Sequence, residues 1–304
     1  MERIGEVLRN GAYTWKQNPI LCAPYILDAI AEFIFFALVF AGLVVVIGTD
    51  IFMAIGSGIS EIMQALQNTG ELSPEVFEAM IGVYQLAVPF TRVFVVALII
   101  LLIGSVLIRT FFEAGAVGMA KNATMTGTTR MNDLFWYGRR STVSLFLANV
   151  VIVLIILAGI VFLVPGILLL DASDSSGMAA AAFAIGIILW IGYMIILSIG
   201  LAPVTYALVI DNKGPIEGIE RGWKFFSSHK LDVFLMWVVM FAIAMLIFTV
   251  GQIFFIHPVT TVIWPFAATL INICIVMPLI TVWWTRLYLD REMLAAGTPA
   301  AALS

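Results

Sequence analysis

Residues 231–256 read LDVFLMWVVMFAIAMLIFTVGQIFFI, and Asp232 is the one charged side chain among them. A helix needs ~20 consecutive apolar residues to cross the ~30 Å hydrocarbon core of a bilayer. Lipid offers no hydrogen-bond partner to free backbone groups, so a segment that crosses it must be a helix or part of a closed barrel. The stretch lacks the alternation of barrel strands. It therefore predicts a transmembrane helix.

Five more stretches have the same character, at residues 24–47, 89–111, 143–170, 178–210 and 261–289. The chain of 304 residues is 62% hydrophobic and 11% charged, whereas soluble domains average ~45–50% apolar and ~25% charged residues. The sequence therefore predicts an all-α fold, a polytopic integral membrane bundle of six transmembrane helices. We expect one domain, residues 1–292, and a flexible cytoplasmic tail, residues 293–304.

The basic residues define the orientation of these helices. An even number of spans places both termini on one side, and every Lys and Arg except Arg92 falls toward that side. The opposite side carries the acidic residues Asp50, Glu61, Glu71, Glu75, Glu78, Asp171 and Asp174. Because cytoplasmic loops are enriched in Lys and Arg, we expect a multi-pass protein of the cell (plasma) membrane with N- and C-termini in the cytoplasm.

The longest outer connection, residues 48–88, is predicted to be partly helical. Apolar residues recur at helical spacing over residues 51–66, which indicates an amphipathic helix at the outer surface. Ser73, Pro74 and Glu75 then resemble a helix start, with a capping serine, a proline in the first turn and an acid near the positive helix end. A surface cover and a ligand lid are the two interpretations of this connection.

Each odd-numbered span follows a segment with one apolar and one charged face, within residues 2–16, 130–140 and 214–226. Cytoplasmic amphipathic helices of this kind lie in the headgroup plane, with aromatic side chains inward and cations toward anionic lipid. The predicted interfacial anchors are Trp15, Trp136, Trp223 and Lys224. The unit of interfacial helix, span, hairpin and span thus occurs three times, as a pattern of physical types or as a true duplication.

Two polar stretches carry a resemblance to a known family. Residues 218–224 read GIERGWK, downstream of APV at 202–204, and residues 285–292 read TRLYLDRE. Together they resemble a broad group of six-span prokaryotic membrane proteins, which includes the membrane domain fused to some glycerophosphodiester phosphodiesterases and related uncharacterised proteins. The resemblance implies architecture and no activity, because the phosphodiesterase chemistry belongs to a separate soluble domain. We expect that domain to be absent, since the sequence ends soon after Glu292.

Asp28 and Glu32 are the sharpest polar feature within a predicted span. They stand four residues apart and share a helix face, while Arg109 and Arg286 lie at similar depth in the second and sixth spans. A charge at the bilayer centre costs ~2.5–3.5 kcal/mol on insertion scales, so such residues are usually paired. We expect at least one carboxylate to face the bundle interior, in an ion-pair lock between helices or in a proton- or cation-linked site.

Two more charged residues lie in or beside the second span. Arg92, at its outer end, is interpreted as snorkelling toward outer headgroups, and anion binding in an outer cavity is the alternative. Glu113 follows Arg109 by one turn, where an i, i+4 pair is worth ~0.2–0.5 kcal/mol.

Glycines and prolines within the spans predict their packing. Glycines allow close helix contacts, and the candidates are Gly42, Gly104, Gly159, Gly186, Gly192 and Gly200. Prolines bend helices, and the candidates are Pro165, Pro203 and Pro278.

No catalytic, metal or cofactor constellation stands out in the sequence. His229 and His257 fall on opposite membrane faces, which argues against a Ser–His pair and a histidine metal site. Cys22 and Cys274 form no CxxC pair, and P-loop, HExxH and GxGxxG motifs are missing. The lack of a basic stripe with interleaved aromatics argues against nucleic-acid binding.

Three functions follow from these patterns. The interfacial helices favour a non-enzymatic membrane protein that binds lipid, a protein partner or a second copy of itself in the cell envelope. The alternative is a small-solute, ion or lipid transporter that uses Asp28 and Glu32. A membrane-embedded lipid-modifying enzyme is the third, and no nucleophile or metal set supports it.

Overall fold

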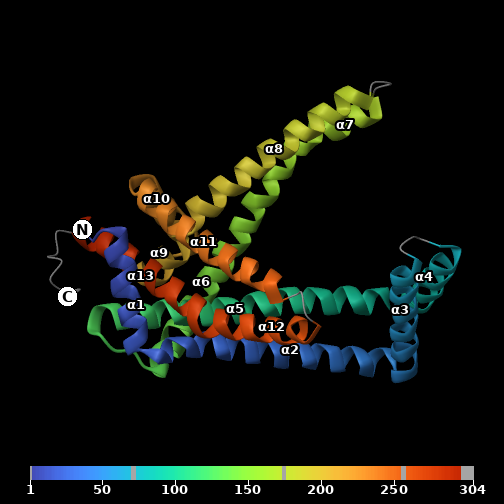
Figure 1. Cartoon of the computed structure of the whole chain (residues 1–304), viewed down its shortest axis with the longest axis horizontal. Coiled ribbons are helices and arrows are strands. Elements are labelled where there is room, and N and C mark those ends of the chain that lie inside the picture. Colours follow the sequence, from blue (N-terminus) through green and yellow to red (C-terminus); the bar gives the residue numbers. More distant parts are fainter. Residues whose placement is uncertain (1, 70–72, 173–175, 255–257, 296–304) are drawn as a thin grey trace. The chain divides into compact units, whose positions relative to one another are not determined.

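The computed structural model describes residues 2–69, 73–172, 176–254 and 258–295, and every regular element within these ranges is helical (Figure 1). Six helical stretches are long and apolar enough to cross a membrane, as predicted. They are Pro19–Ile47, Val76–Thr126, Met131–Leu169, Gly177–Asp211, Lys230–Phe254 and Ile263–Glu292. Most of the predicted flexible tail, residues 296–304, lies outside the described ranges.

Thirteen α-helices and four short turns make up the described chain. The helices are α1 (Ile4–Gln17), α2 (Ala23–Ile47), α3 (Thr49–Thr69), α4 (Pro74–Ala87), α5 (Thr91–Thr126), α6 (Met131–Ala158), α7 (Val164–Ala172), α8 (Ser176–Leu201), α9 (Val204–Asp211), α10 (Pro215–Ser228), α11 (Lys230–Phe254), α12 (Pro258–Ile271) and α13 (Met277–Ala295). The turns are three 3-10 segments, Pro19–Cys22, Val88–Phe90 and Gly159–Leu163, and a π-helical segment, Asn272–Val276.

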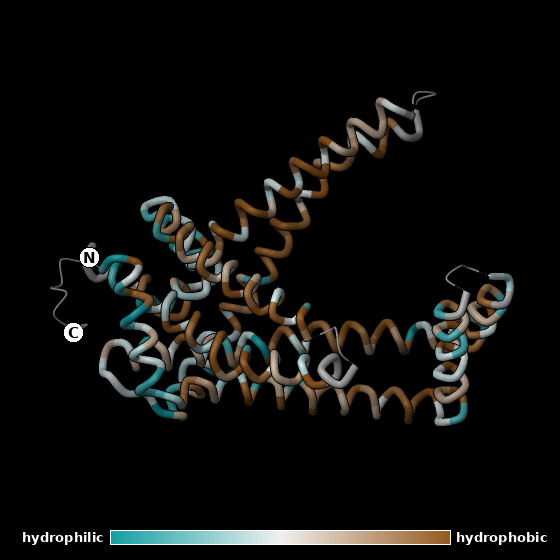
Figure 2. The backbone as a smooth tube through the Cα atoms, in the orientation of Figure 1, coloured by the Kyte–Doolittle hydropathy of each residue, from teal (hydrophilic) through white to brown (hydrophobic). Residues whose placement is uncertain are grey.

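The candidate spans expose much of their apolar surface. The side chains of Phe33, Val45 and Leu246 are exposed by 73%, 82% and 63%, and Figure 2 shows hydrophobic residues over most of the length of α7 and α8. Extended exposed apolar surfaces mark contact with a membrane or another protein. Helices that satisfy all their backbone groups internally suit the hydrocarbon of a bilayer.

Contacts between residues divide the chain into two compact units. The smaller unit is Asp28–Arg109, and the larger unit consists of Met1–Leu27 and Thr110–Ser304. α2 and α5 each contribute residues to both units.

The smaller unit contains most of α2, then α3 and α4, and the first half of α5. Gly48 has a φ of +90°, which glycine adopts without strain, and it turns the chain from α2 into α3. α3 and α4 pack as a pair, because a Cβ atom on Gly58 would meet α4 at 2.5 Å. Ser73 caps α4 as the sequence predicts, with its hydroxyl accepting from the Val76 amide at 3.4 Å.

The second predicted interfacial segment, residues 130–140, is not a separate helix. It forms the first turns of α6, which continues into the third span without a break. No proline interrupts it, and its glycine, Gly138, is buried. The first and third segments are separate helices, because Pro19 follows α1 and His229 ends α10 with a φ of −128°.

The three predicted proline bends coincide with interruptions of the spans. A 3-10 turn precedes Pro165, α8 gives way to α9 at Pro203, and the π-helical segment precedes Pro278. Proline has no amide N–H, so the carbonyl four residues earlier loses its helical partner. For Pro278 this is the carbonyl of Cys274, and the Cys22 thiol donates to it at 2.8 Å.

α13 is the centre of the larger unit. Every residue from Thr281 to Arg291 is buried, and a helix that is buried all round lies in the core of its domain. The surrounding core contains apolar residues of α1, α9, α10 and α11. α1 packs especially closely, since a Cβ atom on Gly11 would meet the Trp283 ring at 2.5 Å and the Trp283 indole donates to the Leu8 carbonyl at 2.8 Å.

Four of the six glycines predicted to mark close helix contacts do so. At Gly104, Gly159, Gly186 and Gly200, a Cβ atom would collide with a neighbouring segment. Gly42 and Gly192 contradict the prediction, because a Cβ atom there would meet nothing within 4 Å. Glycine in a span therefore marks either a close contact or a position with open space beside it.

Candidate functional site

Polar side chains of α13 and its neighbours form two hydrogen-bonded networks, one around Glu2 and one around Asp211. Both include residues of α13, and together we call them the α13 clamp. Its members are Glu2, Asp211, Arg221, Asp232, Arg286, Tyr288, Asp290, Arg291 and Glu292. The side chains of Arg286, Asp290 and Arg291 are almost completely buried. On α13, Arg286 precedes Asp290 by four residues, so the two lie on one face of the helix.

The first part of the α13 clamp joins α13 to the N-terminus. The Arg286 guanidinium donates to both carboxylate oxygens of Glu2, at 2.8 Å from Nε and 2.6 Å from Nη2. The Asn10 amide donates to the same carboxylate at 3.0 Å. Bidentate arginine–carboxylate pairs are geometrically specific and stronger than neutral hydrogen bonds. This pair therefore fixes Glu2, two residues before α1, to α13.

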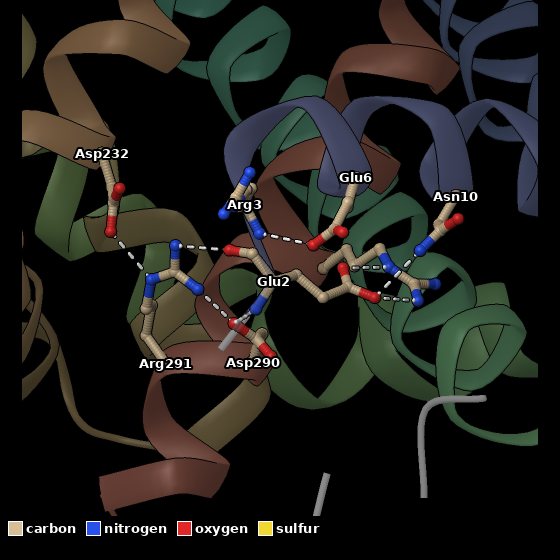
Figure 3. A network of polar contacts seen from close by, with 8 residues as sticks. Glu2, Arg3, Glu6, Asn10, Asp232, Asp290 and Arg291 are labelled. Carbon is tan, nitrogen blue, oxygen red and sulfur yellow. Dashed lines mark hydrogen bonds and ion pairs between the residues drawn. The ribbon is translucent and has the colours of Figure 1, made fainter. Parts of the chain in front are cut away.

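Arg291 forms the second part of the α13 clamp (Figure 3). Its Nε donates to Asp232 of α11 at 2.8 Å, its Nη2 donates to the backbone carbonyl of Glu2 at 3.0 Å, and its Nη1 pairs with Asp290. Asp290 also accepts from the backbone amide of Glu2 at 3.1 Å. One buried guanidinium thus links the N-terminus, α11 and α13.

The third part joins α13 to α9 and α10. The Tyr288 hydroxyl donates to Asp211, the last residue of α9, at 2.7 Å. Nε of Arg221, in α10, donates to the same carboxylate oxygen at 3.2 Å. Arg221 also pairs with Glu292 through Nη2. These contacts explain why both polar stretches singled out in the sequence, 218–224 and 285–292, lie together.

Every carboxylate of the α13 clamp has a hydrogen-bond donor. Five carboxylates share three guanidinium groups, and each carboxylate accepts from at least one donor. Burying ions costs several kcal/mol each, and their attraction offsets this cost only when further hydrogen bonds satisfy them. The network meets that condition, so its evident role is to hold α1, α9, α10 and α11 on α13.

The Glu2 carboxyl makes part of this network sensitive to pH. Hydrogen bonding to Arg286 lowers the pKa of Glu2 below its ordinary value of 4.5, against the opposing effect of partial burial. The hydrogen bond from Asn10 lowers the pKa further. A carboxyl with a lowered pKa stabilises the folded state above its unfolded-state pKa, and the stabilisation is lost as the pH falls through the folded-state pKa.

We therefore expect Glu2→Gln to lower the free energy of unfolding by about 1.5–3 kcal/mol at neutral pH, the usual worth of hydrogen bonds to charged groups. The difference in the free energy of unfolding between wild type and Glu2→Gln should shrink as the pH falls below 4.5. Unfolding in detergent micelles between pH 7 and pH 3 measures it. Glu220→Gln, at an exposed position of α10, is the matched control. A difference that is unchanged at pH 3 contradicts the assignment.

The structure describes the predicted intramembrane carboxylates as follows. Asp28 and Glu32 are both half-buried on α2, and the Oδ1 atom of Asp28 is completely buried. Neither side chain is therefore fully exposed. That one of the two carboxylates faces the bundle interior stays a prediction. Glu113, half-buried on α5, accepts from the Thr205 hydroxyl at 3.2 Å.

The predicted intramembrane arginines have different surroundings. Arg92 and Arg109 are exposed on α5, whereas Arg286 is 5% exposed inside the α13 clamp. The sequence predicts Arg286 at the depth of Asp28 and Glu32, but its bidentate contact is with Glu2, outside the spans.

The predicted interfacial anchors differ in exposure. Trp136 is 52% exposed, and the Arg140 guanidinium lies 4.7 Å from its ring centre. Trp223 is 40% exposed, and Lys224 beside it is exposed. Trp15 is half-buried and packs against a second apolar core formed with the end of α5 and the start of α6. Trp15 therefore contributes to the packing of this core, whereas Trp136 and Trp223 are exposed at the surface.

Two polar cavities border the α13 clamp. One of about 490 Å³ lies between α1, the end of α5 and Arg286. The other, of about 500 Å³, is lined by the six residues Asp211, Lys213, Glu217, Glu220, Arg221 and Lys224. Both lie within the ~300–1,000 Å³ range of small-molecule sites. In the described part of the chain, no group of three or more His, Cys, Asp and Glu side chains could hold a metal ion.

Sequence reasoning missed most of the α13 clamp. It named Arg286 but not Glu2, Asp232 or Asp211 as functional residues, and it treated the TRLYLDRE stretch as a mark of resemblance. A signal was present, because three charged residues in one buried helix end require partners. The partners lie up to 289 residues away in the sequence, so local spacing could not identify them.

Comparison with known proteins adds one distant relative. An uncharacterised protein of Archaeoglobus fulgidus is 24% identical over 301 residues, which cover 96% of each chain. No family model matches the chain, and neither does a solved structure. The class defined by the fold is thus an all-helical multi-pass membrane protein. The resemblance to phosphodiesterase-associated membrane domains stays a prediction.

Proposed function

We propose that this chain is a non-enzymatic multi-pass protein of the plasma membrane, with both termini in the cytoplasm, that binds anionic membrane lipid at its cytoplasmic surface. A protein partner or a second copy of the chain is the alternative occupant of that surface. The central support is the α13 clamp, which fixes α1 and α10 to the bundle and leaves their outer faces exposed.

The outer faces of these helices have the composition of a lipid interface. α1 buries Val7 and exposes Arg9, and α10 buries Phe225 and exposes Lys224. The first turns of α6 present the exposed Trp136 beside Arg140. Tryptophans prefer the headgroup level, and each Lys or Arg near an anionic surface contributes about 1 kcal/mol. These three amphipathic segments therefore form a threefold set of interfacial anchors.

The test compares lipid retained by the purified protein after mild detergent extraction. We expect wild type to be enriched in anionic over zwitterionic phospholipid, and the triple variant Arg139→Gln/Arg140→Gln/Lys224→Gln to retain at least twofold less anionic lipid. All three side chains are exposed, so the fold should persist. The triple variant Asp50→Asn/Glu61→Gln/Glu78→Gln, which neutralises three exposed side chains of the predicted outer connection, is the control. Equal anionic lipid in wild type and the triple variant would reject the proposal.

Transport is the second candidate, supported by the buried Oδ1 atom of Asp28 on a membrane helix. A desolvated carboxyl can hold and release a proton during transport. Proton uptake into sealed vesicles that contain the purified protein, abolished by Asp28→Asn, would favour this candidate over the first.

A further inference from the structure

Gly42 lines a candidate binding site in the smaller unit. A Cβ atom at this position, near the end of α2, would meet nothing within 4 Å. It opens onto a cavity of about 430 Å³ between α2 and α5. The lining residues are Val39, Gly42, Leu43 and Val46 of α2 with Arg92, Val93, Val96, Ala97 and Ile100 of α5. All of them belong to the Asp28–Arg109 unit.

The cavity has the form of a groove with one closed end. One turn beyond Val39 and Ile100, the Phe35 ring lies against Gly104 and brings the two helices together. From Arg92 to Ile100 the groove extends ~12 Å along α5, at 1.5 Å per residue. Half of the ~30 Å hydrocarbon core is ~15 Å. The groove thus spans most of one leaflet.

Arg92 is the single charged residue among the groove's lining residues. It is exposed in the first turn of α5, at the end of the groove where α2 finishes. Among the described residues, it takes part in none of the ion pairs of the structure. A guanidinium beside hydrocarbon favours a partner of opposite charge, and it matches phosphate geometry with two parallel hydrogen bonds.

We propose that this groove binds one hydrocarbon chain of an anionic phospholipid, with the phosphate of the same molecule paired to Arg92. Apolar walls take up the chain, and the cation at the open end selects the headgroup. The assignment to the outer leaflet rests on the proposed function and its orientation. Gly42 keeps the groove open, since any larger side chain there occupies the space of the lipid chain.

Native mass spectrometry of the full chain in detergent, titrated with phosphatidylglycerol or phosphatidylcholine, tests the proposal. We expect one tightly held phosphatidylglycerol per wild-type chain. Gly42→Leu should weaken its binding at least tenfold by filling the groove. Arg92→Gln should remove the preference for phosphatidylglycerol over phosphatidylcholine. Gly192→Leu, at another open glycine in a span, and Arg109→Gln, at another exposed arginine of α5, should behave as wild type.

Wild-type affinity in Gly42→Leu, or an intact headgroup preference in Arg92→Gln, overturns the inference. If Gly42→Leu does not fold, Val46→Phe at an exposed lining position fills the same space. Failure here is distinct from failure of the proposed function. If the cytoplasmic triple variant loses lipid and Gly42→Leu keeps it, the groove alone is refuted. If Gly42→Leu loses lipid and the cytoplasmic triple variant keeps it, the cytoplasmic surface alone is refuted.

Discussion

Replacing Arg291 with methionine is expected to lower the free energy of unfolding by about 3–5 kcal/mol, the usual cost of removing one partner from a buried ion pair. Arg291 donates to Asp232 and to the backbone carbonyl of Glu2, and it pairs with Asp290. Its side chain is 3% exposed and that of Asp290 is 2% exposed. Without the guanidinium, the buried Asp290 carboxylate loses its ion-pair partner.

Equilibrium unfolding in mixed detergent micelles measures this loss. Arg139→Met is the matched control, because Arg139 is exposed at the start of α6 and surface substitutions usually change stability by less than about 0.5 kcal/mol. A loss for Arg291→Met no larger than for Arg139→Met would show that the α13 clamp does not hold the helices together.

A combined variant separates two effects of Arg291→Met. One is the loss of the ion pairs, and the other is the cost of burying carboxylates without a cation. Neutralising both carboxylate partners, as Asp232→Asn and Asp290→Asn, in the Arg291→Met chain should recover part of the stability. The reason is that a buried neutral amide carries a much smaller desolvation cost than a buried carboxylate without a cation. This non-additivity is the signature of residues that act as one network.

The six spans were predictable from the sequence because hydropathy is a local property. The stretch 231–256 alone satisfies the length and composition that a bilayer demands, and α11 occupies Lys230–Phe254. Boundaries were less predictable, as α5 shows by continuing to Thr126 instead of ending at residue 111. The reason is that no proline stands between residues 111 and 126, so the helix continues into the buried apolar core of the larger unit.

The network around α13 was beyond local reasoning. Glu2 and Arg286 are separated by 284 residues, and only the packing of α1 against α13 brings them together. The glycines make the same point within spans. Gly42 and Gly104 look alike in sequence, but one opens onto a groove while the other lies against Phe35. The neighbour of a glycine depends on the distance between its helix and the next one. The spacing of residues along one helix does not specify that distance.

The orientation of the chain has an all-or-none consequence for surface labelling. Glu78 is exposed on α4, and Ser228 is exposed at the end of α10. The excess of Lys and Arg predicts that α10 lies in the cytoplasm and α4 outside. A chain in which Cys22 and Cys274 are replaced by serine and alanine, respectively, provides a background without other thiols. Single cysteines can then be introduced at each position.

Labelling of Glu78→Cys and Ser228→Cys in whole cells with a membrane-impermeant maleimide tests the central claim most directly. We expect Glu78→Cys to be modified in intact cells and Ser228→Cys to be modified only after the cells are opened. Modification of Ser228→Cys in intact cells, with Glu78→Cys protected until lysis, would contradict the account and reverse the sidedness of the α13 clamp and of the groove.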